Sequence, residues 1–453
     1  MKKKINKLFG TDGIRGLANE YPMTPEIAVN VGRAVAFFFK GNHKRSKIII
    51  GRDTRISGHM IEHALVSGIC SMGGDAYLAG ILPTPGVAFI TSSTDADAGI
   101  VISASHNPFY DNGIKIFKSD GYKLSDEIEA EIEQLVLNGK TVSMCRSVRE
   151  TGTAYKLDDS SKNYSDFLKR STSQKNCFKG MKIIIDCSNG ATFKIAPDIF
   201  TDFGADVESL FVKPDGKNIN KNCGSQHPET LIKKVMEKNA DIGLAFDGDG
   251  DRLIAVDEKG NVVNGDQILA VCAKVMKEKG KLKNNLVVST VMSNIGLGFA
   301  LKDQGIKHVA AEVGDRYVME KMMSTGAVIG GEDSGHMIFL DYHTTGDGIL
   351  AALRLIEAMK FESAPLSGLC KRMTIFPQAI LSIEVDKKPD INTISGVQDA
   401  IRSVEKHLKK KGRVLVRYSG TQSLCRIMVE GPTIEETNRY CRQIADKVRE
   451  ELG

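Results

Sequence analysis

Short apolar runs separated by amphipathic stretches recur in three similar sets along about the first 370 residues. Each set predicts a strand, a helix, a second strand and a third strand that ends in a polar loop. The predicted strands lie at 47–50, 73–78 and 98–102, then at 182–185, 204–207 and 241–246, and last at 286–289, 306–310 and 327–330. This repetition predicts three α/β domains with mixed sheets.

The pattern changes after about residue 370. Strands are predicted at 380–385 and 412–417, with a helix near 394–410 and a closing helix from Ile434. These elements are typical of a small C-terminal α+β domain. We therefore expect four domains around a central cleft, with boundaries at 1–155, 156–256, 257–370 and 371–453.

Polar loops follow the third strand of each set, at 103–107, 247–252 and 331–336. Because sites in α/β proteins gather at the carboxyl ends of strands, these three loops are expected to face a common cleft. A fourth loop, at 9–16, places three glycines around Arg15, so its backbone can approach an anion closely. A helix capped by Thr24, with Pro25 at its first position, is predicted after this loop.

Ser105 stands where a buried strand gives way to a polar loop, and this position makes it a candidate nucleophile. His106 is adjacent in the sequence and Lys115 lies ten residues further on. The arrangement is not a Ser-His-Asp triad, because side chains of adjacent residues point apart and no G-x-S-x-G elbow occurs in the chain. Taken alone, the serine is also compatible with an ordinary polar turn.

Three aspartates, Asp247, Asp249 and Asp251, alternate with glycines after the apolar run at 241–246. Their carboxylates would repel one another without a cation, so the spacing favours a site for one hard metal ion. An EF-hand is excluded because Arg252 stands where the calcium loop needs glycine. The string also resembles the D-x-D nucleophile of haloacid-dehalogenase phosphotransferases, in which Asp247 would be phosphorylated. Those proteins usually have Thr or Val where this chain has Asp251, and the aspartate favours metal ligation.

Two further loops carry groups that bind sugars and phosphates. In the loop at 331–336, Glu332 and Ser334 can bond adjacent hydroxyls, and His336 can contact a phosphate or a ring oxygen. The turn at 417–423 offers the guanidinium of Arg417, several hydroxyls and a glycine N–H, which are the groups that a phosphate needs.

Composition narrows the class of protein. With 453 residues the chain is long enough for several domains, and its 42% hydrophobic and 26% charged residues are ordinary for a soluble protein. The net charge of +5 is diffuse, so no nucleic-acid partner is expected. No apolar stretch predicts a signal peptide or a membrane segment. Nine cysteines without a C-x-x-C pair indicate reduced thiols, and we expect a cytoplasmic location.

Taken together, the S-H-N-P, D-G-D-G-D-R, G-E-x-S-G-H and R-x-S-G-T motifs resemble the α-D-phosphohexomutase superfamily over essentially the whole chain. The stretches F-G-T-D-G-I-R-G and S-A-S-H-N-P-F-Y-D-N-G-I-K look like the bacterial phosphoglucosamine mutase family within it. The chain departs from that family's usual motifs at Asp333, Tyr418, Gln422 and Ser423, although the phosphate-binding groups are retained.

The resemblance implies a role for each motif residue. It implies that Ser105 is phosphorylated in the active enzyme and that one Mg²⁺ per subunit is held by the three aspartates and the seryl phosphate. The remaining implied groups are those around the transferring phosphoryl group (Arg15, His106, Lys115 and Arg252, with Lys115 moving the proton), those at the sugar (Glu332, Ser334 and His336), and those that grip the non-reacting phosphate (Arg417, Ser419, Gly420 and Thr421).

The activity implied by the resemblance is interconversion of glucosamine 6-phosphate and glucosamine 1-phosphate through a 1,6-bisphosphate, which supplies UDP-N-acetylglucosamine synthesis. The expected partner is therefore a small phosphosugar, and a homodimer is left open. The alternatives are a phosphomannomutase/phosphoglucomutase, a Mg²⁺-dependent phosphatase that uses Asp247, and a phosphosugar-binding regulator without turnover.

Overall fold

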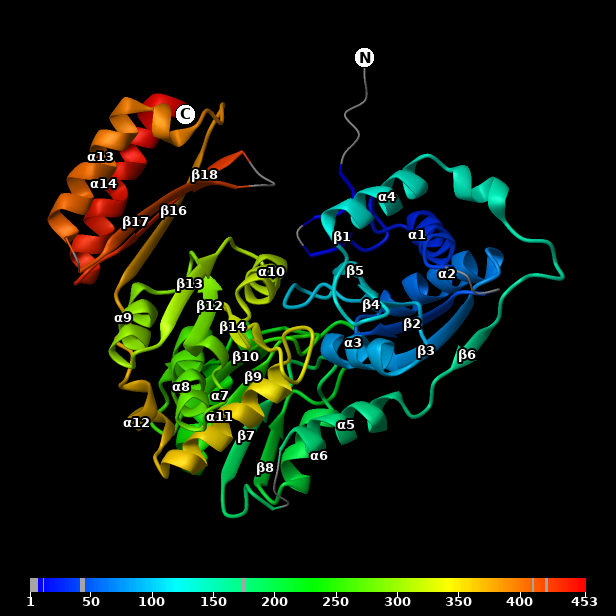
Figure 1. The fold of residues 1–453 in the computed structure, drawn as a ribbon, viewed down its shortest axis with the longest axis horizontal. Coiled ribbons are helices and arrows are strands. Elements are labelled where there is room, and N and C mark those ends of the chain that lie inside the picture. Colours follow the sequence, from blue (N-terminus) through cyan, green and yellow to red (C-terminus); the bar gives the residue numbers. More distant parts are fainter. Residues whose placement is uncertain (1–6, 11, 41–44, 173–175, 410, 420–422) are drawn as a thin grey trace. The chain divides into compact units, whose positions relative to one another are not determined.

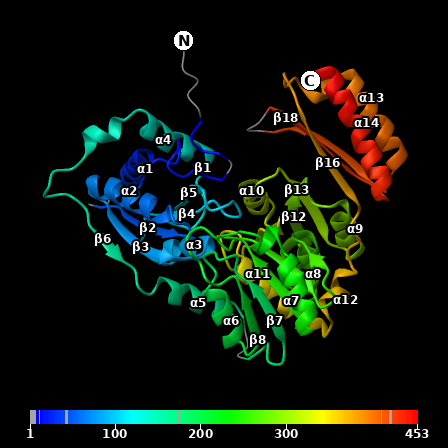
Figure 2. The same cartoon turned by 180° about the vertical axis from the view of Figure 1, so that it is seen from behind.

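The structure is a computed structural model and describes residues 7–453 apart from 11, 41–44, 173–175, 410 and 420–422. It contains two compact units (Figures 1 and 2). The first comprises Met1–Val291 and Lys307–Cys370, and the second comprises Met292–Ile306 and Lys371–Gly453. None of the described helices is long and apolar enough to cross a membrane.

The first sheet of the larger unit has the strand order β1-β5-β4-β2-β3-β6. Its central strand β2 is parallel to both β3 and β4, whereas β5 is antiparallel to β4 and β1. The strands are β1 (Ile14–Leu17), β2 (Lys47–Arg52), β3 (Asp75–Ile81), β4 (Ala98–Ile102), β5 (Asp111–Lys118) and β6 (Ala154–Lys156), and the helices are α1 (Pro25–Phe38), α2 (Gly58–Ser71), α3 (Thr84–Ser93), α4 (Asp126–Leu137) and α5 (Ser160–Ser171). The predicted start of α1 is confirmed, because the Thr24 side chain accepts a hydrogen bond from the N–H of Ile27.

The second sheet has the order β11-β10-β9-β7-β8, with β7 parallel to β8 and β9 and antiparallel pairing beyond β9. Its elements are β7 (Lys182–Asp186), α6 (Ile195–Asp202), β8 (Asp206–Leu210), α7 (Glu229–Lys238), β9 (Ile242–Phe246), β10 (Leu253–Asp257) and β11 (Val262–Val263).

The third sheet has the order β13-β12-β14-β15. Its elements are α8 (Gly265–Glu278), β12 (Leu286–Thr290), β13 (Lys307–Ala311), α10 (Asp315–Thr325), β14 (Ile329–Gly331), β15 (Met337–Phe339), α11 (Gly348–Glu362) and α12 (Leu366–Cys370).

Three predicted strands begin two residues later than the sequence pattern indicated. One of them, predicted at 327–330, is β14, and the other two share a cause. The strands predicted at 73–78 and 204–207 are β3, which begins at Asp75, and β8, which begins at Asp206. In both places a glycine with positive φ, Gly73 at 81° and Gly204 at 88°, ends the preceding helix in the left-handed conformation. The residue after each glycine donates back to a helical carbonyl, so the turn belongs to the helix and not to the strand.

The smaller unit has a three-stranded antiparallel sheet in the order β16-β18-β17 with two long helices on one face. Its elements are α9 (Ile295–Asp303), β16 (Gln378–Glu384), α13 (Ser395–Leu408), β17 (Arg413–Tyr418), β18 (Leu424–Glu430) and α14 (Ile434–Leu452). Alternate strand residues pack with α13 and α14 in one core. Three mixed α/β sheets and this α+β unit confirm the predicted fold class.

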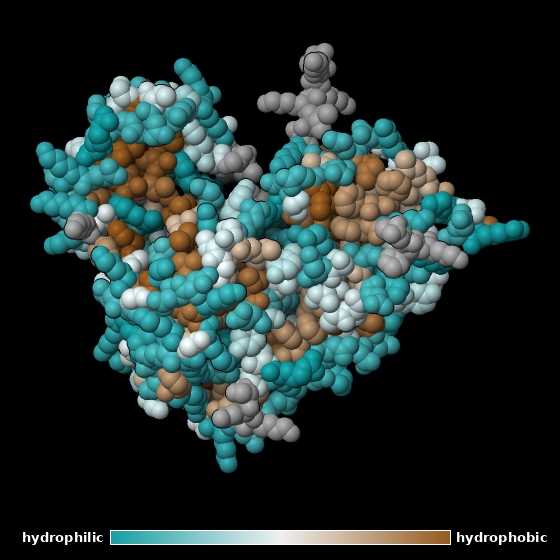
Figure 3. Space-filling model, viewed as in Figure 1, coloured by the Kyte–Doolittle hydropathy of each residue, from teal (hydrophilic) through white to brown (hydrophobic). Residues whose placement is uncertain are grey.

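The other face of the small sheet is not covered by α13 and α14. Ile380 points to that face and is 49% exposed, and apolar side chains are visible over the strands of this unit in Figure 3. Because strand side chains alternate between faces, Arg417 and Arg426 share this open face with Ile380.

Candidate functional site

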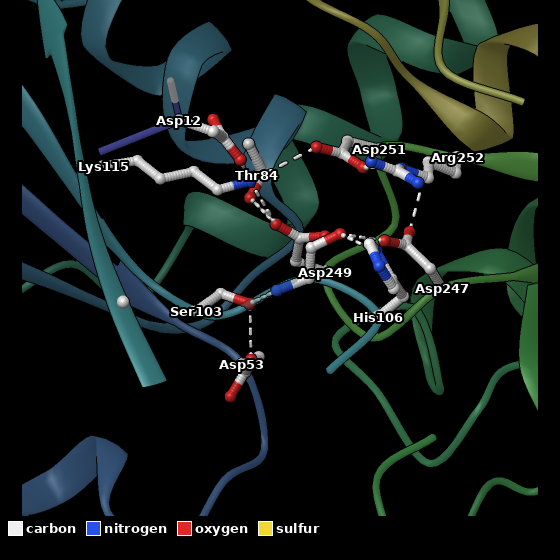
Figure 4. A network of polar contacts seen from close by, with 12 residues as sticks. Asp12, Asp53, Thr84, Ser103, His106, Lys115, Asp247, Asp249, Asp251 and Arg252 are labelled. Atoms are coloured by element: carbon white, nitrogen blue, oxygen red, sulfur yellow. Dashed lines mark hydrogen bonds and ion pairs between the residues drawn. The ribbon is translucent and has the colours of Figure 1, made fainter. Parts of the chain in front are cut away.

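The loops after β4 and β9 come together in the larger unit (Figure 4), and the loop after β14 joins them. The hydroxyl of Ser105, after β4, donates to Asp247 Oδ2 over 2.6 Å, and Asp247 follows β9. Arg252, at the end of the same loop, forms a β-bridge with His336 of the loop after β14. Each sheet of this unit therefore delivers one polar loop to a single polar cluster.

Ser105 is held in an unusual backbone conformation. Its φ is 53°, in the left-handed region that residues other than glycine seldom adopt, and only 1% of its surface is exposed. Its Oγ lies 3.3 Å from Nδ1 of His106, in addition to the bond to Asp247. Burial, followed by the nearby Arg252 and Arg15, lowers the pKa of His106 to about 4, so this ring is neutral near pH 7.

The three aspartates form a compact carboxylate cluster. One oxygen of each of Asp247, Asp249 and Asp251 lies within 4.8 Å of the others, and all three residues are buried. Oδ1 of Asp249 and Oδ1 of Asp251 are buried and have no hydrogen bond to any described residue. Burial and the two neighbouring carboxylates raise the pKa of Asp247 well above its ordinary value. Buried oxygens without donors and mutually repelling carboxylates fit a hard divalent cation.

Lys115, on β5, places its ammonium against this cluster. Its Nζ lies 2.9 Å from Asp249 Oδ2, 3.4 Å from Asp251 Oδ2 and 3.2 Å from Asp12 Oδ2. Burial alone would lower the pKa of this lysine, but the three carboxylates outweigh it and the pKa is raised well above its ordinary value. Lys115 is therefore a fully buried cation.

Two arginines lie at the same cluster. Arg15, on β1, forms an ion pair with Asp12. The backbone N–H of Arg252 donates to Asp247 Oδ1 over 3.2 Å, and its side-chain Nε lies 3.8 Å from Asp251 Oδ1. Cationic groups therefore flank the serine hydroxyl and the carboxylates, an arrangement suited to a transferring phosphoryl group.

The loop at 331–336 presents polar groups that have few partners within the described chain. The hydroxyl of Ser334 and both ring nitrogens of His336 are buried without a hydrogen bond to a described residue. His336 Nε2 lies 3.6 Å from Asp315 Oδ2, and Glu332 Oε1 accepts from the N–H of Gly314 over 3.2 Å. Buried polar groups of this kind need an external partner, and sugar hydroxyls would supply one.

The candidate phosphate-binding turn belongs to the smaller unit. Arg417 lies directly opposite Arg426, and Arg426 lies directly opposite Ser382, so the three residues form one row across the sheet. This row lines a pocket of about 180 Å³. The N–H of Ser419 donates to the carbonyl of Leu424, and Gly420 and Thr421 lie outside the described residues. Two arginines opposite each other on neighbouring strands, both lining this pocket, favour an anion there.

Several residues of the cluster were not identified from the sequence. Thr84 donates from its hydroxyl to Asp249 Oδ2 over 2.6 Å and from its N–H to the Asp249 carbonyl over 2.8 Å. Asp12 pairs with Lys115 and with Lys123, and Lys123 also pairs with Asp315. Asp12 lies in the glycine loop already noted, and Thr84 opens α3 three residues after the end of β3, so position in a loop beside a strand was the signal available for both.

Comparison with known proteins agrees with this arrangement along the chain. Family models described as phosphoglucomutase/phosphomannomutase alpha/beta/alpha domains I, II and III match residues 6–143, 162–260 and 264–376, and the model of the C-terminal domain matches 381–447. A phosphoglucosamine mutase of Syntrophus aciditrophicus is 59% identical over 99% of this chain and 100% of its own length. The phosphoglucosamine mutase of Geobacter metallireducens is 51% identical over 99% of this chain and 100% of its own.

Solved structures share the fold at lower identity. A phosphoglucomutase/phosphomannomutase family protein from Burkholderia thailandensis has a TM-score of 0.81 at 23% identity, covering 98% of this chain and 97% of its own. An Aspergillus fumigatus N-acetylphosphoglucosamine mutase in complex with GlcNAc-6P and magnesium has a TM-score of 0.70 at 16% identity, covering 98% and 96%.

Proposed function

This chain belongs to the phosphoglucomutase/phosphomannomutase family, and we propose that it interconverts glucosamine 6-phosphate and glucosamine 1-phosphate. The choice of amino sugar rests on the curated relatives at 51–59% identity, which are named phosphoglucosamine mutase. The observation that carries the chemistry is the Ser105 hydroxyl, which points at the carboxylate cluster with cations on either side. The enzyme is an isomerase that moves a phosphoryl group within one sugar.

The proposed reaction has two phosphoryl transfers. Phosphoserine 105 gives its phosphoryl group to the free hydroxyl of the sugar phosphate, so the bond from phosphorus to Ser105 Oγ breaks and a bond to the sugar oxygen forms. The resulting 1,6-bisphosphate turns around, and its other phosphoryl group returns to Ser105 Oγ. Neither step needs a further co-reactant, because the phosphoryl group lost by the serine is regained in the second transfer.

The described side chains divide this work. Lys115 is the proposed proton-transfer group, and its carboxylate neighbours keep it protonated in the resting site. It is proposed to give a proton to Ser105 Oγ as the phosphoryl group leaves and to take the proton of the reacting sugar hydroxyl, so the proton lost by the sugar ends on the serine. Arg15, Arg252 and the neutral His106 surround the transferring group and offset or bond its oxygens. Glu332, Ser334 and His336 are proposed to hold the sugar. The polar groups of Ser334 and His336 are buried without a hydrogen bond to a described residue, and Glu332 lies in the same loop.

The carboxylates of Asp247, Asp249 and Asp251, with the seryl phosphate, are proposed to hold one Mg²⁺ per subunit. When bound, the ion supplies positive charge against the oxygens of the transferring phosphoryl group. Arg417, Ser419, Gly420 and Thr421 are proposed to grip the phosphate that does not react, so that either end of the sugar can be presented in turn. We also infer a cytoplasmic location, since thiols without a paired spacing persist in reducing compartments. Measurement of the molar mass in solution decides whether the chain forms a homodimer.

The direct test is phosphopeptide mapping of the active enzyme together with assays of Ser105→Ala. We expect phosphate on Ser105, loss of mutase activity in the variant and normal activity in the control Ser67→Ala, whose hydroxyl lies on the exposed face of α2. Chelation should remove activity and Mg²⁺ should restore it. If Ser105→Ala still releases inorganic phosphate from the sugar phosphate, the chain is a phosphatase that uses Asp247.

Sugar specificity is tested by assaying glucosamine, mannose and glucose phosphates side by side. We expect the glucosamine phosphates to have the highest kcat/KM. Faster turnover of the mannose or glucose phosphates would assign the chain to phosphomannomutase/phosphoglucomutase activity. Phosphosugar binding without turnover by the fully phosphorylated protein would indicate a regulator.

A further inference from the structure

The backbone of the Ser105 loop is held from behind by a buried chain of hydrogen bonds. The hydroxyl of Ser103 donates to Asp53 Oδ2 over 2.5 Å and accepts from the N–H of Ser105 over 3.0 Å. Asp53 also forms an ion pair with Arg55, and neither side chain is exposed. Both residues follow β2, so the strand beside β4 supports the loop that β4 delivers (Figure 4).

Arg55 reaches the carbonyl groups of the same loop. Its Nη2 donates to the carbonyl oxygen of Ser105 over 3.2 Å and to that of Asn107 over 2.5 Å. The guanidinium is planar, so one side chain can bond two carbonyls and the Asp53 carboxylate at the same time. These bonds fix the carbonyl of Ser105 on the side of the loop that faces Arg55.

Asn220, in a loop of the second sheet, bonds the same two carbonyls. Nδ2 of Asn220 donates to the carbonyl oxygens of Ser105 and Asn107, each over 2.9 Å. Asn220 lies between β8 and α7, on the polypeptide segment that belongs with the aspartate-bearing β9 and not with β4. Arg55 and Asn220 therefore clamp the two carbonyls, and the clamp joins the seryl loop to the sheet that bears the metal ligands.

The close approach also explains a glycine in the aspartate loop. A Cβ atom at Gly248 would lie 2.6 Å from the Ser105 carbonyl oxygen and 2.7 Å from Nδ2 of Asn220. No side chain fits there without moving the loop or the amide. The seryl backbone is thus packed directly against the backbone between two of the aspartates.

We propose that Asp53, Arg55, Ser103 and Asn220 are positioning residues that hold Ser105 in its left-handed conformation and thereby aim its oxygen at the aspartate cluster. A φ of 53° costs a serine free energy relative to extended backbone, so the conformation persists only if neighbouring groups enforce it. The four residues bond the backbone and the Ser103 hydroxyl, and no hydrogen bond joins them to Ser105 Oγ itself. They therefore influence the reaction by orienting the Ser105 backbone, which sets the direction in which the phosphoryl group points.

This inference rests on the phosphoserine chemistry proposed above, and it predicts a specific kinetic signature. When the loop is loosened, the phosphoseryl group should meet the sugar hydroxyl less often, while the sugar and its distal phosphate still bind. The value of kcat should fall with KM nearly unchanged, and the fraction of phosphoserine lost to water in place of sugar should rise. A residue that only stabilised the fold would change none of these ratios.

The test uses the full-length phosphorylated enzyme with Asn220→Gly, and Asn222→Gly as the matched control. Both asparagines have positive φ, 58° and 53°, so glycine suits both backbones, but Asn222 is exposed and makes no side-chain hydrogen bond recorded among the described residues. Deleting the Asn220 amide should lower kcat about tenfold, the size expected for losing a half-buried donor that bonds two carbonyls. KM should change less than twofold, and the ³¹P resonance of phosphoserine should shift only in Asn220→Gly.

A second variant, Arg55→Lys, keeps the charge but cannot bond both carbonyls and Asp53 together, and we expect a larger loss of kcat with the same rise in hydrolysis. If Arg55→Lys does not fold, the asparagine pair decides alone. Equal kcat and equal hydrolysis in Asn220→Gly and Asn222→Gly would overturn the proposal. Activity that survives in Ser105→Ala would instead overturn the phosphoserine chemistry, so the two failures are distinguishable.

Discussion

At the scale of single residues, Thr84 shows how a neighbouring side chain can orient Asp249, a proposed metal ligand. Its hydroxyl donates to Asp249 Oδ2, which also bonds Lys115, and its N–H donates to the main-chain carbonyl of Asp249. Oδ1 of Asp249 has no hydrogen bond to a described residue. Groups that orient a metal ligand in this way are commonly worth a factor of about 10–100 in metal affinity. Thr84 and Lys115 therefore hold the Asp249 carboxylate together.

We predict that Thr84→Val raises the Mg²⁺ concentration needed for half-maximal activity by about tenfold or more. Valine keeps the shape of threonine but removes the hydroxyl donor. Titration of activity with Mg²⁺ measures the effect. Thr91→Val on the same helix is the control, because among the described residues that hydroxyl bonds the carbonyl of Val87 and none of the aspartates. Identical Mg²⁺ dependence in both variants would show that Thr84 does not orient Asp249.

Arg417 allows a prediction for substrate binding. A charge-assisted hydrogen bond contributes about 1.5–3 kcal/mol, so Arg417→Ala should raise KM for both sugar phosphates and let more bisphosphate escape between the two transfers. Steady-state kinetics and bisphosphate release should be measured together. Arg402→Ala, an exposed arginine of the same unit, is the control, and Lys115→Ala should lower kcat without the same leakage. An unchanged KM with no leakage would mean that this turn is not the phosphate grip.

At the scale of elements, the loop that follows β9 is constrained by its glycines as much as by its aspartates. We predict that Gly248→Ala lowers kcat by at least tenfold, because the added Cβ would contact the Ser105 carbonyl and the Asn220 amide. The matched control is Gly368→Ala in α12, where a Cβ would meet no atom closer than 3.7 Å. Similar kcat values for the two variants would show that the backbones can separate without cost.

A buried histidine joins the third repeat to the first. His343 Nδ1 accepts from the N–H of Thr344 over 2.8 Å, so the proton lies on Nε2, which is 2.8 Å from the carbonyl oxygen of Pro85 in α3. Burial lowers the pKa of His343 to about 4. The folded protein therefore holds this ring neutral, whereas the unfolded chain protonates it near pH 6.5.

Because the folded pKa is the lower one, the stabilisation from neutral His343 is complete above about pH 6.5 and is lost as the pH falls toward 4. A shift of this size corresponds to about 3 kcal/mol of unfolding free energy. We predict that His343→Gln, which keeps a donor but does not titrate, has a flatter pH dependence of unfolding over this interval than the parent protein. Denaturant titrations at several pH values measure it, with exposed His407→Gln as the control. Parallel curves for the His343 variant and the parent would contradict the prediction.

At the scale of the whole molecule, the smaller unit is assembled from two distant stretches of sequence. Residues 292–306, which include α9, belong to it although β12 and β13 on either side belong to the larger unit. Asn294 bonds the backbone N–H and carbonyl of Phe376, and the N–H of Ile295 donates to the fully buried carboxylate of Glu430. These bonds are satisfied only when both stretches are present.

We predict that a fragment of residues 371–453 unfolds at a lower denaturant concentration than the same fragment with 292–306 fused through a flexible linker. Without α9, Glu430 loses the Ile295 donor and keeps the Arg413 ion pair, and leaving a buried carboxylate short of a donor costs about 1–3 kcal/mol. Urea titrations followed by circular dichroism compare the two. Equal midpoints would show that α9 does not contribute to the stability of this unit.

The sequence by itself determined the fold class, the family and the order of the polar loops. Alternation of apolar runs is a local property, so strand positions could be predicted to within a few residues. Motifs such as D-G-D-G-D-R indicate a metal site before any coordinates are known. Strand starts at 73 and 204 were misplaced because a left-handed glycine extends the helix before it. The domain boundaries, the site roles and the groups at Gly420 and Thr421 stay predictions.

Only the tertiary structure decided which residues surround the serine. The partners of Lys115 lie at Asp12, Asp249 and Asp251, and those of the Ser105 carbonyl lie at Arg55 and Asn220. Hydrogen bonds and ion pairs act over a few ångströms, whereas these residues are separated by up to about 140 positions in the chain, and no local pattern records which distant groups packing will bring together. Periodicity and motifs can be recognised in a short stretch of sequence. The partners of a buried group are determined only when distant strands pair and pack together.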